Sequence, residues 1–148
     1  MHKFAPSKFI KMKKIIVFLG IILPAISFAQ IKIGAGLGLT FNESTVLGPQ
    51  VRLQYQFDDY MDLAGTYNYY LNKDAGYAFD FDFRYHLINI GNHRIKPMAG
   101  LSIRKVGGVG LNVGLVMDFQ LESFRLYIEP KYVIDDITFF GLSAGVMF

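Results

Sequence analysis

The feature that most constrains this chain is an alternation of apolar and polar residues that runs from Ile31 to Phe148. Short segments rich in Asp, Asn and Gly divide the alternation into eight stretches of about ten residues. Because successive side chains of a β-strand point to opposite faces, each stretch predicts a strand with one apolar and one polar face. The sequence therefore predicts an all-β fold of eight antiparallel strands, connected up and down by tight turns.

The predicted strands are similar in length. They occupy residues 31–41, 50–57, 61–71, 77–87, 95–104, 109–119, 124–134 and 140–148. Turns and loops are predicted between them at 42–49, 58–59, 72–76, 88–93, 105–108, 121–123 and 135–136. Within the strands, Pro97 and Pro130 cannot donate a hydrogen bond to a neighbouring strand. We therefore expect a bulge or a strand end at each proline.

One face of the predicted strands carries all of their charge. The apolar face includes many Phe and Tyr residues and no charged residue, whereas the polar face combines charged residues with glycine. The charged positions are Lys32, Arg52, Asp62, Asp80, Asp82, Arg84, Lys96, Arg104, Asp118, Arg125, Glu129 and Lys131. An eight-stranded barrel encloses only enough space for its inward side chains, and the aromatic face would overfill it. We therefore expect the apolar face to point outward and the charged face to point inward.

The position of the aromatic residues along the strands indicates a membrane environment. They gather near both strand ends, as Phe41 and Tyr77 do toward one rim and Tyr55 and Phe119 toward the other. Two aromatic girdles around an apolar band are typical of transmembrane barrels. Because an open sheet edge cannot be satisfied in lipid, the strands are expected to close into a ring. A soluble barrel with its apolar face inward, as in lipocalins, is the alternative.

The N-terminal residues 1–29 are predicted to be a cleaved signal peptide. Basic residues precede a short apolar run, which ends in a motif of small residues at Ala29. Met12 is an alternative translation start to Met1. The remaining residues, 30–148, are predicted to form a single barrel domain in the outer membrane of a Gram-negative cell.

Composition excludes several classes of function. Five of the 15 Lys and Arg residues precede Ile15, and all 12 acidic residues follow Gln30, so the net charge of +3 belongs to the N-terminal segment. A basic surface for nucleic acid is therefore not expected. The chain has no cysteine, which excludes disulfides and thiolate metal sites. His86 and His93 have no other metal ligands at suitable spacing, so we predict no metal and no other cofactor.

The end of the chain, GLSAGVMF, alternates apolar residues and finishes on Phe. With this ending, the stretch 30–148 resembles the small eight-stranded outer-membrane β-barrels of the OmpA/OmpX type, particularly the short forms found in Bacteroidetes. The resemblance implies that Leu142, Val146 and Phe148 form the signal that the barrel-assembly machinery reads. Proteins of many roles share this architecture, so the resemblance does not define an activity.

The inward charges predict a closed lumen. Because buried charges persist only when they are paired and hydrogen-bonded, the twelve charged positions are expected to form an ion-pair network. Strand pairing about the predicted turns places Asp80 opposite Ser102, and Asp118 near Arg125. The predicted role is structural, or a surface contact made through the 42–49 loop. A narrow channel for ions or small solutes is the alternative, and it requires a gap in the packing.

A lipid-remodelling enzyme is the third hypothesis. Such catalysis needs a serine within about 3 Å of a histidine base. His86 and His93 lie near one predicted rim, whereas Ser44 and Ser102 lie toward the other, so we predict that the protein is not an enzyme. The expected partners are outer-membrane lipid, lipopolysaccharide and, during biogenesis, the assembly machinery. We expect a monomer with both termini in the periplasm.

Overall fold

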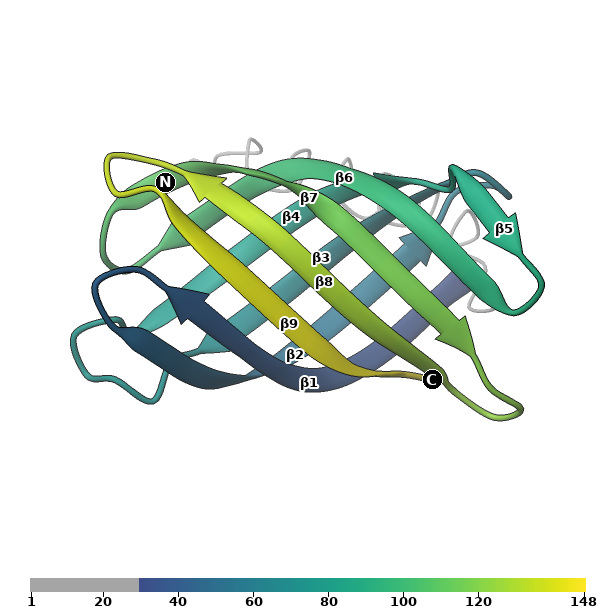
Figure 1. The fold of residues 1–148 in the computed structure, drawn as a ribbon, viewed down its shortest axis with the longest axis horizontal. Coiled ribbons are helices and arrows are strands. Elements are labelled where there is room, and N and C mark those ends of the chain that lie inside the picture. Colours follow the sequence, from purple (N-terminus) through teal and green to yellow (C-terminus); the bar gives the residue numbers. More distant parts are fainter. Residues whose placement is uncertain (1–29) are drawn as a thin grey trace, which may run out of the picture. The chain divides into compact units, whose positions relative to one another are not determined.

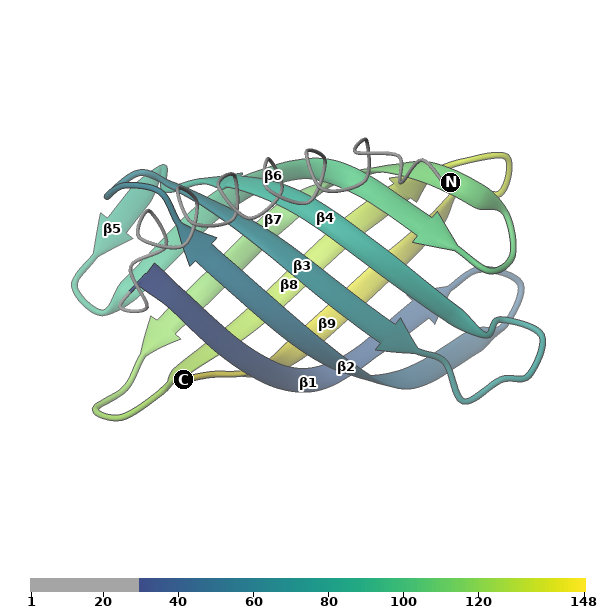
Figure 2. The ribbon, with the colours of Figure 1, turned by 180° about the vertical axis from the view of Figure 1, so that it is seen from behind.

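The computed structural model describes residues 30–148 and contains nine β-strands (Figures 1 and 2). They are β1 (Ile31–Phe41), β2 (Thr45–Gln56), β3 (Met61–Tyr69), β4 (Tyr77–Tyr85), β5 (Ile88–Ile90), β6 (His93–Arg104), β7 (Gly108–Gln120), β8 (Arg125–Ile134) and β9 (Phe139–Met147). The signal peptide predicted at 1–29 lies outside the described residues. No helix among the residues described has the length and apolar character needed to cross a membrane.

The strands form one antiparallel sheet that closes on itself. β1 pairs with β2 on one side and with the last strand, β9, on the other. β4 pairs directly with β6, so eight long strands complete the ring and the short β5 pairs with β6 alone. Figures 1 and 2 show the strands inclined to the barrel axis, as closure of a sheet requires. The predicted eight-stranded up-and-down barrel is confirmed.

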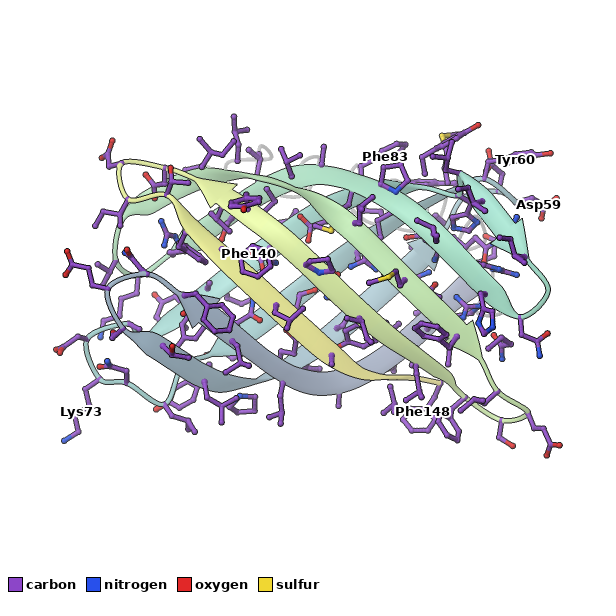
Figure 3. All side chains as sticks on the ribbon, viewed as in Figure 1. Asp59, Tyr60, Lys73, Phe83, Phe140 and Phe148 are labelled. Carbon is purple, nitrogen blue, oxygen red and sulfur yellow. The ribbon has the colours of Figure 1, made fainter. Side chains whose placement is uncertain are left out.

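Side chains alternate between the interior and the outer surface along the strands, most regularly in β4. Phe81 is 49 % exposed, whereas its neighbours Asp80 and Asp82 are at most 2 % exposed. Figure 3 shows Phe83 and other aromatic side chains projecting from the outside of the barrel. The predicted orientation, with the apolar face outward and the charged face inward, is confirmed.

Outward aromatic rings contact one another at both ends of the barrel. Phe140 lies between Phe41 and Tyr132, with centroid separations of 5.9 and 5.3 Å. At the end that holds the C-terminus, the rings of Phe124 and Phe148 are 6.5 Å apart. These contacts join neighbouring strands and agree with the two predicted girdles.

The loop predicted at 42–49 is wrong, because β2 begins at Thr45. Gly48 and Pro49 have the composition of a turn, yet both pair with β1 inside the strand. A Cβ at Gly48 would collide with the backbone carbonyl of Tyr69. A close approach of neighbouring backbones therefore accounts for this glycine, and only a short turn separates β1 from β2.

The strand end predicted at Pro97 and at Pro130 is wrong, because β6 and β8 continue through these residues. The predicted bulge is found at Pro97, where residues 85–87 face only residues 96–97 of β6, and not at Pro130. Pro97 pairs with Leu115 of β7, and the β4–β6 ladder stops beside it at Met98. Pro130 pairs with Leu142 of β9, while the β7–β8 ladder is interrupted at the proline and resumes in the same register. Each proline thus removes local pairing on one side of a strand that itself continues.

The turn predicted at 88–93 contains the additional strand β5, which pairs with the first residues of β6. Gly91 makes the hairpin turn with a φ of +56°, which glycine adopts without strain. β4 and β5 both pair with β6, but their registers on β6 differ by one residue. In Figure 1 the hairpin lies at the same end of the barrel as the C-terminus.

Candidate functional site

The alternation along the strands brings charged side chains from different parts of the ring together inside the barrel. Glu129 of β8 is fully buried, and its Oε2 lies 2.7 Å from the guanidinium groups of both Arg52 in β2 and Arg84 in β4. Lys131 Nζ lies 3.5 Å from the second oxygen, Oε1. Three cations thus surround one carboxylate, which compensates for the loss of its hydration.

Lys131 connects this carboxylate to Asp80 of β4. Its Nζ lies 2.6 Å from Asp80 Oδ2, which also accepts a 2.8 Å hydrogen bond from Asn68. Asp80 is opposite Ser102 of β6 in the strand register, as predicted. One lysine therefore bridges Glu129 and Asp80 across the lumen.

A second group of ion pairs is centred on Asp62 of β3. Lys96 Nζ lies 2.9 Å from Asp62 Oδ2 and 2.6 Å from Asp118 Oδ2. Arg125 Nη1 is 3.4 Å from the same oxygen of Asp118, so the predicted proximity of these two residues is observed. Lys96 is fully buried, and the two carboxylates supply the negative charge that its burial requires.

His86 contacts acceptors through both of its ring nitrogens. Nε2 lies 2.6 Å from Asp62 Oδ2, and Nδ1 lies 2.8 Å from the backbone oxygen of Asp59. A carbonyl oxygen and an ionised carboxylate cannot donate, so both contacts are hydrogen bonds when both ring nitrogens carry protons. The ring thus links Asp62 of β3 to the backbone of the turn that precedes this strand.

The other histidine described, His93, packs against the Phe119 ring at a centroid distance of 5.1 Å. The hydrogen bonds of the His86 ring go to aspartates and none goes to a serine. Among the described residues, no group of three or more His, Asp and Glu side chains is arranged to hold a metal ion.

Three of the predicted network residues stand apart from these two groups. In the part of the chain that the structure describes, Lys32 and Asp82 form no ion pair. Asp82 is fully buried and accepts a 2.7 Å hydrogen bond from Asn112 Nδ2. Arg104 pairs with Asp135, which lies beyond the end of β8. The structure thus brings most of the predicted positions together and leaves Lys32 and Asp82 without an ion pair among the described residues.

Tyr127 of β8 is a lumen residue that the charge pattern does not identify. Its hydroxyl accepts a 2.6 Å hydrogen bond from Gln50 Nε2, and the Arg52 guanidinium lies 4.1 Å from its ring centroid. Gly36 and Gly145 lie between Gln50 and Tyr127 in the register. A Cβ at either glycine would come within 2.6 Å of the phenol oxygen. The inward glycines in the sequence indicate that a large side chain lies next to them in the lumen. That this side chain is Tyr127 follows only from the strand register.

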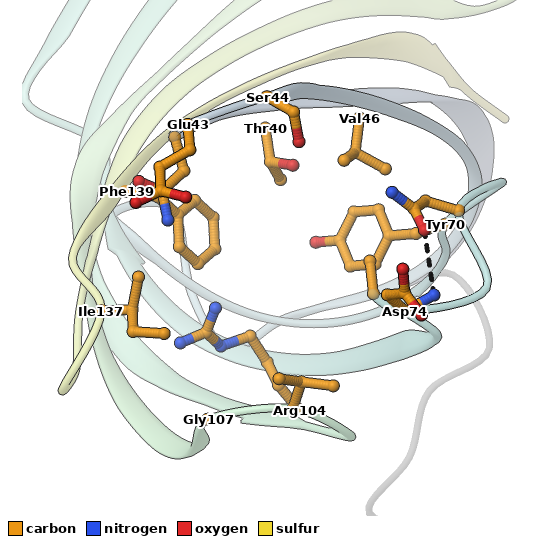
Figure 4. A pocket seen from close by; sticks show the side chains of 14 residues that line it. Thr40, Glu43, Ser44, Val46, Tyr70, Asp74, Arg104, Gly107, Ile137 and Phe139 are labelled. Atoms are coloured by element: carbon orange, nitrogen blue, oxygen red, sulfur yellow. Dashed lines mark hydrogen bonds between the residues drawn. The ribbon is translucent and has the colours of Figure 1, made fainter.

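The barrel has a vestibule of about 260 Å³ at the end opposite the C-terminus (Figure 4). Its lining includes Thr40, Glu43, Tyr70, Asp74, Arg104 and Phe139. The Arg104 guanidinium lies 4.5 Å from the Phe139 ring centroid, and its Nη2 is 2.5 Å from Asp135 Oδ2. The vestibule therefore contains an arginine whose charge is already paired.

Two groups outside the strands at this rim have shifted pKa values. The backbone N–H of Asp136 donates to the Asp135 carboxylate, and this bond, with that from Arg104, lowers the Asp135 pKa. Burial, together with the charge of Asp80, raises the pKa of Tyr70 to about 12. The aspartate is therefore ionised at neutral pH, whereas the phenol is protonated.

Two residues of the predicted assembly signal, Leu142 and Val146, lie in β9, and the third, Phe148, directly follows this strand. Leu142 pairs with Leu39 of β1, and Val146 pairs with Ala35. Phe148 is 71 % exposed and is labelled near the end of the chain in Figure 3. Its backbone N–H donates a 2.8 Å hydrogen bond to the Ile33 carbonyl. The terminal residue thus keeps its place in the closing ladder while its ring faces outward.

No family model and no curated protein matches this chain. Among solved structures, the N-terminal β-barrel domain of OprF from Pseudomonas aeruginosa is similar, with 18% sequence identity and a TM-score of 0.61. The match covers 80% of this chain and 98% of that domain. A de novo designed transmembrane β-barrel has 11% identity and a TM-score of 0.63, with coverages of 80% and 94%.

Ail, the attachment invasion locus protein of Yersinia pestis, is also similar, in a structure solved with the heparin analogue sucrose octasulfate. It has 14% sequence identity and a TM-score of 0.53, and the match covers 80% of this chain and 96% of Ail. At these identities the comparisons establish the fold alone. The chain has the fold of the small eight-stranded transmembrane β-barrels of the OmpA/OmpX type, as its resemblance to them predicted.

Proposed function

We propose that this protein is exported to the outer membrane and acts there without catalysis, as a closed barrel with a structural or surface-contact role. The observation that carries the proposal is the arrangement of charge. Outward positions of the strands are apolar or aromatic, while Glu129, Asp80 and Asp62 are buried among cations inside. Lipid outside and compensated charge inside are the conditions under which such a barrel is stable.

The ion pairs support a lumen that does not conduct. Arg52, Arg84 and Glu129 come from β2, β4 and β8, and each is at most 1 % exposed. An ion that entered would have to separate charges that are buried and in direct contact, which is unfavourable. An eight-stranded ring has little space in which these side chains could move aside.

Surface contact is better supported at the segment 70–76 than at the predicted 42–49 loop. Because β2 begins at Thr45, the first connection at this rim is a short turn, whereas 70–76 joins β3 to β4 without strand structure. Loops on a rigid scaffold are common sites of recognition. The similar fold of Ail, an attachment protein by name, supports a contact role in general.

A narrow channel remains the second candidate, and the surroundings of Asp82 favour it. Asp82 Oδ2 and Asn112 Oδ1 are buried and have no hydrogen-bond partner among the described residues. Polar atoms of this kind are commonly satisfied by internal water. Water bound at these two oxygens would provide the start of an ion path beside Asp82.

Planar bilayer recordings distinguish the two candidates. The protein purified from membranes in detergent is added to a bilayer, and its current is recorded over a range of voltages. We expect no stepwise conductance from the wild-type barrel. Regular single-channel steps that change in Asp82→Asn would support the channel and overturn the closed lumen.

Membrane fractionation with a heat-modifiability gel tests the proposed location separately. Recovery of the protein in the soluble fraction would overturn that location.

A further inference from the structure

A groove of about 450 Å³ lies beside the segment 70–76, next to the vestibule. It is lined by Tyr69, Tyr70, Leu71, Asn72, Lys73, Gly76, Tyr77 and Lys105. The groove thus combines two lysines with Tyr69 and Tyr77, which are exposed and belong to the aromatic girdle of this rim. We refer to it as the lysine–tyrosine groove.

The backbone holds Lys105 at the groove. Its N–H donates a 3.0 Å hydrogen bond to the carbonyl of Tyr77, and its aliphatic stem crosses Gly76. Gly76 has a φ of +68°, and a Cβ there would overlap the Lys105 side chain. Glycine at position 76 therefore permits the positive φ of the turn and leaves room for the Lys105 side chain. Lys73 approaches the groove from the segment between β3 and β4.

The positive charge of the groove is not compensated within the described part of the protein. Lys73 and Lys105 are exposed, and neither forms an ion pair with a described residue. Asp74, the acidic residue closest to Lys73 in sequence, lines the vestibule and not the groove. The nearby Arg104 differs, because its guanidinium is paired with Asp135. An anion would therefore meet two available ammonium groups.

The surface next to the groove is apolar. Tyr77 and Phe79 of β4 are 43 % and 44 % exposed, and Ile103 of β6, opposite Phe79 in the register, is 48 % exposed. The ring of Tyr67 stacks on Tyr77 at 6.3 Å and lies 4.8 Å from Phe79. A molecule with an anionic head at the lysines could thus lay apolar chains along β4 and β6.

We propose that the lysine–tyrosine groove binds the phosphate of a phosphorylated glycolipid in the outer leaflet, with its acyl chains along Tyr77, Phe79 and Ile103. The proposal rests on the outer-membrane location proposed above and on the expected periplasmic position of the termini, which together place this rim in the outer leaflet. Ammonium groups bind phosphate as point charges, and tyrosines suit the interface between head groups and chains. The lysines would contact the phosphate of the lipid, the tyrosines would lie at the interface between head group and chains, and the apolar residues of β4 and β6 would contact the acyl chains.

The test measures binding of purified lipid A to the barrel in uncharged detergent micelles by native mass spectrometry. We expect Lys73→Gln with Lys105→Gln to weaken binding about thirtyfold at low salt, since each basic residue near an anionic surface contributes about 1 kcal/mol. Lys73→Arg with Lys105→Arg keeps the charge and should keep most of the affinity. Lys32→Gln, which removes a lysine at the opposite rim, is the matched control.

Two further measurements define the ligand. In the first, dephosphorylated lipid A should bind the wild-type barrel as weakly as bisphosphorylated lipid A binds the double glutamine variant. In the second, millimolar inorganic phosphate should displace little of the lipid A bound to the wild-type barrel. Equal binding by wild type and the glutamine variant, or full displacement by inorganic phosphate, would overturn the proposal. A heat-modifiability gel on each variant verifies the fold, and fractionation of cells tests the location independently of lipid binding.

Discussion

At the scale of single residues, two buried carboxylates of the lumen, Glu129 and Asp118, each contact more than one cation. Glu129 contacts Arg52, Arg84 and Lys131, so its loss would leave three positive charges without the carboxylate that compensates them. The positive groups are held by separate strands and cannot separate without distorting the ring. A buried carboxylate of this kind is therefore more important for stability than an ion pair on a surface.

Glu129→Gln is expected to lower the free energy of unfolding by about 3–5 kcal/mol, because it leaves buried charges uncompensated while preserving side-chain size. The measurement is urea unfolding of the barrel in lipid vesicles, followed by tyrosine fluorescence. Lys32→Gln is the control, since Lys32 forms no ion pair among the described residues, and its effect should stay within about 0.5 kcal/mol. Equal stability of Glu129→Gln and wild type would contradict the importance of this cluster.

Asp135 provides a pH-dependent contact outside the strands. Its pKa is lowered first by the Asp136 N–H and then by Arg104, so the contact contributes fully above the usual carboxyl value of about 3.9. This contribution disappears as the pH falls through the lower, folded-state value. Carbon NMR of the Asp135 carboxyl should therefore give a midpoint below the usual value.

Arg104→Gln should move that midpoint only part of the way back, since the hydrogen bond from Asp136 persists. Asp136→Asn is a control for the loss of a neighbouring charge, because it leaves the backbone N–H of residue 136 in place. A wild-type midpoint at or above the usual aspartate value would refute the proposed contacts at this rim.

At the scale of elements, the pairing of β1 with β9 closes the barrel and requires small residues. Gly36 and Gly145 are opposite each other, and a Cβ at Gly36 would collide with the carbonyl of Ala144 and lie 2.6 Å from the Tyr127 hydroxyl. The carbonyl belongs to the backbone and cannot move without opening the ladder. The closing pair thus has less tolerance for side-chain volume than an outward position of the same sheet.

Gly36→Ala is expected to destabilise the barrel by about 1–3 kcal/mol through this overlap, measured by the same unfolding assay. Gly65→Ala is the matched control, because the nearest atom to its added Cβ is in the Phe81 ring, 4.0 Å away. Adding Tyr127→Phe to Gly36→Ala should not restore stability, since the collision with the Ala144 carbonyl remains. If the double variant were as stable as the wild type, the destabilisation by Gly36→Ala would come from the Tyr127 hydroxyl alone.

The sequence predicted strands well where two faces differ in character and less well where local chemistry competes with long-range pairing. In β4, alternation of Phe and Asp determines both the strand and its orientation. Gly48-Pro49 and Pro130 resemble turn or break signals, but pairing with β1 at Gly48-Pro49 and with β9 at Pro130 keeps them extended. The interaction of Tyr127 with Gln50 could not be predicted, because it depends on the register of three strand pairs.

At the scale of the whole molecule, the barrel reverses the usual arrangement of a soluble protein. Its exposed outer surface includes Phe79, Phe81 and Phe83, each more than 40 % exposed, while Arg84 and Asp82 are buried. The apolar surface is stable only in lipid, so folding and membrane insertion depend on each other. The ion pairs between strands far apart in sequence also require that the ring be nearly complete before they form.

This dependence makes the last strand the natural place for a recognition signal, and it leads to a prediction for Phe148. The Phe148 ring is 71 % exposed and its backbone bonds to Ile33 do not involve the side chain. Phe148→Ala should therefore leave heat-modifiability and unfolding in vesicles nearly unchanged, while the amount of barrel in the outer membrane of growing cells falls several-fold. Ile137→Ala, at an exposed residue of the opposite rim, is the control. It should reduce neither the stability of the purified barrel nor its amount in the outer membrane. Normal amounts of Phe148→Ala in the membrane would refute the assembly role, whereas an equal defect in purified protein would assign the residue to stability instead.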